Sequence, residues 1–306
     1  MKNSHSALSF LVGICISLGC AFLMQKPLMA QQKGTPPKRG GLTPRIEREK
    51  QRAELEALKK SAPEQGVFWS DSPSVPIEMI KAINYSRSRG EYRSALFAPN
   101  GGWLVTQVDG GAYQAGLPQE PLKDLTDLMH GGSFFEVIRH AAFSPQGAWV
   151  FQFGMNDSGF HTGGNFPEKL RDKLWQLYKS TTPLIFRGVI KSIAFTSDGG
   201  WVLIYKPPTR PLEPERKWEA VWDNVPDDFV NKLEELRRRQ AGLRVVFAPK
   251  GGWLILYNNT EFAYSNIPQG AVDKLTELKN NHRQLLDAAF APNGGWVVVA
   301  SGRFGL

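Results

Sequence analysis

Aromatic residues that are each followed by a polar residue recur along the chain and are suited to binding a ligand. The aromatic members are Trp69, Tyr113, Phe160, Trp222 and Tyr264, and the residues after them are Ser70, Gln114, His161, Asp223 and Ser265. Aromatic rings beside polar groups can hold a glycan or a small cation. If the strands that carry these residues line a common axis, the central pocket would be aromatic and polar. The predicted binding residues are Trp69, Tyr113, Phe160, His161, Trp222, Asp223 and Tyr264.

Catalytic chemistry has weaker support in this sequence. Hydrolysis by two carboxylates stays open, because acids from different units need not form a linear motif, and the candidates are Asp109, Asp157 and Asp223. The histidines lie at 5, 130, 140, 161 and 282, and none has zinc-ligand spacing with another ligand. The chain contains no phosphate-binding glycine loop and no nucleophile elbow. We therefore predict no metal site, no cofactor and no catalytic residue.

The elements that position these residues belong to an internal repeat. A phrase of Phe, a Pro-x-Gly type of turn and Trp occurs five times, with Trp-to-Trp spacings of 46, 52, 52 and 43 residues. The repeat Phe residues are Phe97, Phe143, Phe195, Phe247 and Phe290, and the repeat Trp residues are Trp103, Trp149, Trp201, Trp253 and Trp296. Because a core requirement recurs in every unit whereas a site is local, we predict that the repeat Trp residues are core.

Each repeat is predicted to contain three short strands and one helix. The Phe ends one apolar strand, the Pro and Gly form a tight hairpin turn, and the Trp opens a second strand. A third strand carries the aromatic residue of the predicted site. A helix then begins near a proline, such as Pro226, with apolar residues on one face, as at Phe229, Leu233 and Leu236.

The two ends of the repeat region complement each other. Residues 66–70, followed by Pro76 and the apolar positions Ile77, Ile80 and Ile83, match the third strand and helix of a repeat, yet they precede the first hairpin. The fifth hairpin lies near the C-terminus and lacks that half-unit. We therefore predict an α+β repeat protein in which five units form a closed, propeller-like ring, completed by pairing of the N- and C-terminal half-units.

The repeat phrase resembles the inner hairpin of β-propeller blades, as in Phe143-Ser144-Pro145-Gln146-Gly147. The order of three strands and one helix, repeated five times over residues 66–306, resembles the β/α-propeller of the pentein family. That resemblance implies the fold alone. Pentein enzymes that modify guanidines use a cysteine nucleophile, and this region contains no cysteine.

The N-terminus predicts export. Lys2, the apolar run 7–24 and the sequence Leu28-Met29-Ala30 have the arrangement of a secretory signal peptide over residues 1–30, with an uncleaved membrane anchor at 7–24 as the alternative. Residues 31–65 are predicted to be a flexible linker and a charged helix at 45–60. Both cysteines, Cys15 and Cys20, lie in the signal segment, so a cleaved chain would have none.

Composition fits a globular domain with a sizeable core. Hydrophobic residues make up 42% of the 306 residues, and the formal net charge of +8 is spread along the chain. We expect a monomer that binds no specific nucleic acid, and contact with a membrane only if the N-terminal segment is retained. The predicted function is a non-catalytic secreted or periplasmic binding or scaffolding module for a glycan or an envelope protein. The alternative is a carbohydrate-active hydrolase with a carboxylate pair in the axial pocket.

Overall fold

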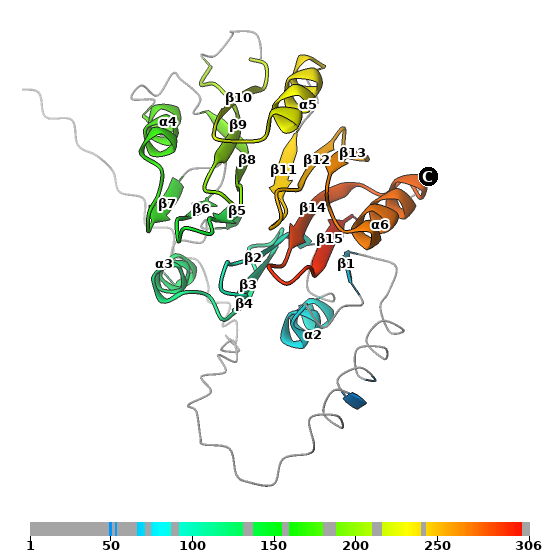
Figure 1. Ribbon diagram of the computed structural model, residues 1–306. Coiled ribbons are helices and arrows are strands. Elements are labelled where there is room, and N and C mark those ends of the chain that lie inside the picture. The colour runs from blue at the N-terminus through cyan, green and yellow to red at the C-terminus, as the bar shows by residue number, and fades with distance from the viewer. Residues whose placement is uncertain are drawn as a thin grey trace, which may run out of the picture.

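A computed structural model (Figure 1) describes residues 49–50, 53, 66–70, 75–86, 92–130, 137–154, 159–179, 188–209, 216–239 and 243–301. They form five three-stranded antiparallel sheets and five helices, the arrangement of a propeller-like repeat protein. The predicted signal segment 1–30 lies outside the described residues, as does most of 31–65, although Glu49, Lys50 and Ala53 are helical. Within the described residues, no helix is both long enough and apolar enough to cross a membrane.

The elements follow the repeat order. Sheet 1 contains β2 (Tyr92–Phe97), β3 (Trp103–Gln107) and β4 (Ala112–Ala115), and sheet 2 contains β5 (Ile138–Phe143), β6 (Trp149–Phe153) and β7 (Gly159–Gly163). Sheet 3 contains β8 (Val189–Phe195), β9 (Trp201–Lys206) and β10 (Glu219–Asp223), and sheet 4 contains β11 (Arg244–Phe247), β12 (Trp253–Tyr257) and β13 (Glu261–Ser265). Sheet 5 contains β14 (Leu285–Phe290), β15 (Trp296–Ala300) and β1 (Val67–Trp69). The helices are α2 (Ile77–Ser86), α3 (Gln119–His130), α4 (Glu168–Tyr178), α5 (Asp227–Arg238) and α6 (Gln269–Asn280).

The repeat phrase forms the hairpin that its chemistry predicts. The turn glycine adopts a positive φ in every copy, for example +85° at Gly101, where a residue with a side chain would be strained. The Ala98 N–H donates to Gly102 O at 2.7 Å and closes the turn. The five repeat Trp residues are 4–8% exposed, so their predicted place in the core is confirmed.

The first strands of the sheets meet at the centre, and the helices lie at the periphery (Figure 1). Strand β2 contacts β5, β5 contacts β8, β8 contacts β11, β11 contacts β14, and β14 contacts β2. The third strands β4, β7, β10 and β13, and with them β1, form the outer edges of the sheets. The third strands therefore do not line the axis, and the condition on which the predicted axial pocket depended is not met.

Each helix packs against the sheet that follows it in the repeat order. Helix α4 leaves sheet 2 and buries Leu170, Leu174 and Leu177 in a cluster with Ile193 and Leu203 of sheet 3. Helices α2, α3, α5 and α6 occupy the same place between other consecutive sheets. One of these clusters joins sheet 5 to sheet 1 through α2.

Sheet 5 is assembled from both ends of the described chain. Strand β1 pairs antiparallel with β15, with Val67 opposite Val299 and Trp69 opposite Val297. The Ser70 N–H donates to Trp296 O at 3.0 Å, and the Ala300 N–H donates to Gly66 O at 2.7 Å. The N-terminal segment thus supplies the third strand that the fifth hairpin lacks, as its sequence predicts.

Substitution of Trp69 tests how much this pairing stabilises the fold. Trp69 is 8% exposed, whereas Tyr264, which holds the equivalent place in sheet 4, is 45% exposed. We expect Trp69→Ala to lower the free energy of unfolding by about 3–5 kcal/mol through loss of buried ring area. Tyr264→Ala should change it by less than about 1 kcal/mol. Urea denaturation measures both, and equal effects would contradict a stabilising role for the terminal strand.

Candidate functional site

A polar side chain occupies the same position in every first strand, three residues before the repeat Phe. We call these five the slot residues, and they are Ser94, His140, Ser192, Arg244 and Asp287. In four of the five strands the pairing register shifts by one residue just before the slot residue. A β-bulge of this kind bends the strand and redirects the next side chain. All the slot residues are buried apart from the partly exposed Arg244.

Three slot residues bond to the backbone of the first strand of the next unit. His140 Nε2 lies 3.0 Å from the Ile193 N–H and 2.8 Å from Ile193 O. Ser192 Oγ accepts from the Val245 N–H at 3.0 Å and is 3.4 Å from Val245 O. Asp287 accepts a hydrogen bond from the backbone of Ala95 in sheet 1. Ser94 differs, because its hydroxyl bonds to Thr106 in its own sheet at 2.9 Å.

Arg244 and Asp287 form a bidentate ion pair between β11 and β14. Arg244 Nε donates to Asp287 Oδ1 at 2.6 Å, and an Nη donates to Oδ2 at 2.7 Å. The Ala288 N–H donates to the same carboxylate at 2.9 Å. Burial raises the pKa of the Asp287 carboxyl above its ordinary value, and the Arg244 charge and the backbone N–H groups oppose that rise. The carboxylate is therefore surrounded by donors within the protein.

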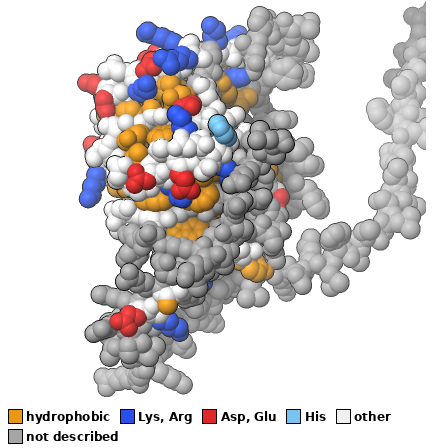
Figure 2. Space-filling model, turned by 90° about the vertical axis from the view of Figure 1, so that its right-hand side faces the viewer, with side chains coloured by type: hydrophobic (Ala, Val, Ile, Leu, Met, Phe, Trp, Pro, Cys, Tyr) orange, Lys and Arg blue, Asp and Glu red, His pale blue; other side chains and the backbone are white. Residues whose placement is uncertain are grey.

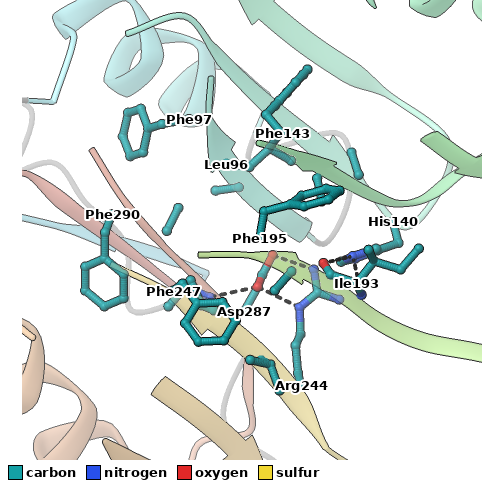
Figure 3. Close-up of a pocket in the computed structure, with 18 residues that line it drawn as sticks. Leu96, Phe97, His140, Phe143, Ile193, Phe195, Arg244, Phe247, Asp287 and Phe290 are labelled. Atoms are coloured by element: carbon teal, nitrogen blue, oxygen red, sulfur yellow. Dashed lines mark hydrogen bonds and ion pairs between the residues drawn. The ribbon is translucent and has the colours of Figure 1, made fainter. Parts of the chain in front are cut away.

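The slot residues His140, Arg244 and Asp287 line a cavity of about 100 Å³ at the axis. The remaining lining comes from the same five first strands and includes all five repeat Phe residues. Figure 3 shows Phe97, Phe195, Phe247 and Phe290 arranged round the cavity, with the Arg244–Asp287 pair and His140 on one side. Ligand pockets for drug-sized molecules are about 300–1,000 Å³, so this cavity fits a group of only a few atoms.

His140 is neutral in the folded protein. Burial, together with the nearby positive charge of Arg244, lowers its pKa from 6.5 to about 3. Its Nε2 lies within hydrogen-bond distance of the Ile193 backbone, while its buried Nδ1 has no hydrogen-bond partner among the described residues. The side-chain amide of Gln152, opposite His140 in sheet 2, is likewise buried without a partner there.

The seven residues predicted as a binding site are spread over the outer strands of all five sheets and are not brought together. Trp69 is buried, and Tyr113, Phe160 and Trp222 are partly buried against the apolar clusters. Tyr264 is the exposed member of this aromatic set. The other four rings pack in the apolar clusters that also hold the helices. Whether any of the seven residues binds a ligand stays a prediction.

The polar members of the predicted site bridge a sheet to the helix before it. His161 Nδ1 is 3.1 Å from Asp124 of α3, and Asp223 accepts from Lys169 of α4 at 3.2 Å. Both pairs are exposed, so they contribute little to stability. The other acid candidates give no pair either, because Asp109 caps its own turn through the Gly111 N–H and Asp157 lies outside the described residues.

Sequence reasoning missed an exposed aromatic cluster on the helical rim. Trp175 of α4 is 49% exposed, and its ring lies 5.1 Å from Phe160 at an interplanar angle of 65°. Tyr178 lies 4.7 Å from the same Phe160 ring, and its hydroxyl donates to Gly159 O at 3.1 Å. The available signal was Trp175 itself, a large ring outside the apolar stripe of its helix.

Charged groups on the surface are mixed in sign. On the face in Figure 2, acidic and basic side chains are interspersed with apolar ones. The run Arg237 to Arg239 at the end of α5 pairs in part with acids of the same helix, as in Arg237–Glu234 and Arg239–Glu235. Among the described residues, no three His, Cys, Asp or Glu side chains are placed to hold a metal ion together.

Comparison with known proteins identifies no family. No protein-family model and no curated protein matches the chain. Among solved structures it is similar to one described as YCF48 bound to D1 peptide, with 16% identity and a TM-score of 0.30. The match covers 70% of this chain and 62% of that one.

The lowered pKa of His140 predicts a pH-dependent stability. Between pH 6.5 and about 3 the unfolded chain binds a proton at His140 that the folded chain does not, so stability falls as the pH falls. From about pH 7 to about pH 5, wild type should lose about 2 kcal/mol through this group. His140→Gln removes that loss, so the stability gap between variant and wild type should narrow by this amount in urea denaturation. His161→Gln on the exposed β7 strand is the control. A gap for His140→Gln that does not change with pH would show that the imidazole is not buried as described.

The ion pair predicts a second stability result. Asp287→Ala leaves Arg244 without its carboxylate and should cost about 3–5 kcal/mol. The double variant Arg244→Ser and Asp287→Ser should lose less, because it removes the unpaired charge and places in both strands the serine found at Ser94 and Ser192. Urea denaturation of the three proteins decides the point, and a double variant no more stable than Asp287→Ala would contradict it.

Proposed function

We propose that the protein is a non-catalytic, extracytoplasmic binding or scaffolding module built as a closed ring of five units. The observation that carries this proposal is that the axial carboxylate is already hydrogen-bonded within the protein. Asp287 accepts hydrogen bonds from Arg244, Ala288 and Ala95, and it is the one acid among the described residues that line the cavity. Carboxylate-pair hydrolysis needs two acids flanking a substrate, so the hydrolase alternative gains no support.

Closure of the ring is supported by the junction between the last and first units. Strand β1 completes sheet 5, α2 packs between sheets 5 and 1, and Asp287 bonds to the backbone of Ala95. The same three kinds of contact join units in the middle of the chain. A five-fold ring of three strands and one helix per unit is the pentein-like arrangement, here in a region without cysteine.

A glycan is the ligand that the exposed surface favours. The axial cavity is too small for a sugar ring with its hydroxyl groups, which places the binding surface on the rim. The aromatic cluster of Phe160, Trp175 and Tyr178 offers a half-exposed indole that packs at an angle against Phe160, and the Phe160 ring in turn packs against Tyr178. Such a ring can stack on the apolar face of a sugar without first losing side-chain freedom.

Export to the periplasm or the exterior is proposed from the N-terminal sequence. An exported binding module would meet glycans and envelope proteins there, and a chain without cysteine cannot form wrong disulfides in that compartment.

Binding to a glycan array, with the full chain after signal removal, tests this function. We expect Trp175→Ala to weaken any glycan found by about 3- to 10-fold, the range for loss of one aromatic stacking contact. Val189→Ala is the matched control, since Val189 is 41% exposed and adjoins the end of α4 through the Gly188 N–H bond to Leu177 O. If both variants bind the glycan equally well, the rim cluster is excluded as the binding surface. Capture of an envelope protein with no glycan bound would favour the scaffolding form of the proposal.

A further inference from the structure

The guanidinium of Arg244 has donors that the ion pair does not use. Arginine carries five N–H groups, and Asp287 takes the one on Nε and one on an Nη. Arg244 makes no other hydrogen bond within the part of the chain that the structure describes, although it lines the cavity and its side chain is 15% exposed. Three N–H groups remain, and two of them, one on each Nη, are parallel and form a complete edge, the geometry that binds a carboxylate in a bidentate manner.

A second buried polar atom belongs to the same cavity. The imidazole of His140 also lines it, and His140 Nδ1 has no partner among the described residues. His140 Nε2 lies within hydrogen-bond distance of both the Ile193 N–H and Ile193 O, so Nδ1 is a donor when Nε2 accepts from the N–H and an acceptor when Nε2 donates to the carbonyl. In Figure 3 the guanidinium lies between Asp287 and the His140–Ile193 contact, so its unused edge is on the His140 side.

The rest of the cavity wall is apolar. The five repeat Phe rings and small or branched aliphatic residues such as Ala141 and Ala288 complete it. A ligand that fits both the polar and the apolar lining of the cavity has one acceptor group for Arg244 and a short apolar group for the Phe rings. The negative charge of Asp287 is already balanced by its own hydrogen-bond donors. Asp287 lies against a different edge of the guanidinium from the unused one.

We propose that the axial cavity is a binding site for a small organic acid, whose carboxylate binds the unused edge of Arg244 while its short hydrocarbon part lies among the repeat Phe residues. This site is separate from the rim cluster on α4 and does not depend on glycan binding. Asp287 acts in it as a positioning residue that fixes the plane of the guanidinium.

Propionate and propionamide provide the direct test, because they have nearly the same shape but differ in charge. Titration of the intact protein at neutral pH and constant ionic strength, followed by calorimetry and amide NMR shifts, should show saturable millimolar binding of propionate. The shifted amides should belong to the first strands β2, β5, β8, β11 and β14. Propionamide should bind at least about tenfold more weakly, since only the charged acceptor gains fully from the guanidinium.

Arg244→Lys is the informative variant, because lysine can keep the ion pair with Asp287 but has no planar donor edge. We expect it to weaken propionate binding by about tenfold or more. Arg237→Lys is the matched control, since Arg237 also makes a bidentate pair, with Glu234, but on the surface of α5. Trp175→Ala should leave propionate binding unchanged, which separates this site from the glycan surface.

Three results would overturn the proposal. They are no saturable binding of propionate to wild type, equal binding of propionamide, and full binding by Arg244→Lys. If Arg244→Lys fails to fold, the comparison of the two ligands on wild type still decides the matter. Failure of these tests would leave the rim proposal intact, because that proposal involves no residue of the cavity.

Discussion

Five strand edges that meet at one axis set the central constraint on this molecule. Each first strand pairs with the second strand of its sheet along one edge only, so its other edge faces the centre with backbone groups to satisfy. The slot residues supply part of what is missing. His140 and Ser192 each lie within hydrogen-bond distance of both the backbone N–H and the carbonyl oxygen of one residue in the next first strand. Asp287 accepts from the Ala95 N–H across the terminal junction. Loss of these bonds would leave buried polar groups unsatisfied, which costs more than the net strength of the bonds themselves.

This constraint explains the local features around the axis. A side chain on a regular strand stands roughly perpendicular to its own sheet, and in four of the strands a β-bulge before the slot residue redirects it toward the neighbouring strand. The helices provide the corresponding contact at the periphery, because each one leaves a sheet and packs against the next. Four of the five pairs of consecutive sheets are therefore joined twice, by slot contacts near the axis and by an apolar helix farther out, and sheets 1 and 2 are joined by helix α3. A unit on its own would bury neither side, and its stability depends on both neighbours.

Much of this architecture could be predicted from the sequence, and the reasons are local. The Pro and Gly of the repeat phrase specify a hairpin without tertiary context, and the proline before each helix specifies a start. The half-unit at 66–86 predicted that the N-terminal segment completes the fifth unit, and the structure pairs Val67 with Val299. The inner and outer strands could not be told apart in this way, since the repeat gives the order of three strands but not which edge strand, the first or the third, faces the axis. The site was consequently assigned to Trp222 and its equivalents at the outer edge. The polar slot three residues before each repeat Phe was visible in the sequence, but its meaning depended on knowing which strand faces the axis.

The residue types at the slot position indicate two different roles. One is to satisfy polar groups near the axis, and the other is a more specialised role in the cavity. Serine is small and neutral, and Ser192 satisfies backbone groups of the next first strand at low cost, while Ser94 bonds to Thr106 of its own sheet. Arg244 and Asp287 are a charged pair largely removed from water, and their desolvation makes such a pair no more stabilising than neutral residues. His140 adds a ring whose buried Nδ1 has no hydrogen-bond partner among the described residues. These three departures from the simplest solution, all lining one cavity, are poorly explained by stability alone. They are explained if that side of the axis recognises a charged acceptor, for which a guanidinium held by a carboxylate is the appropriate donor.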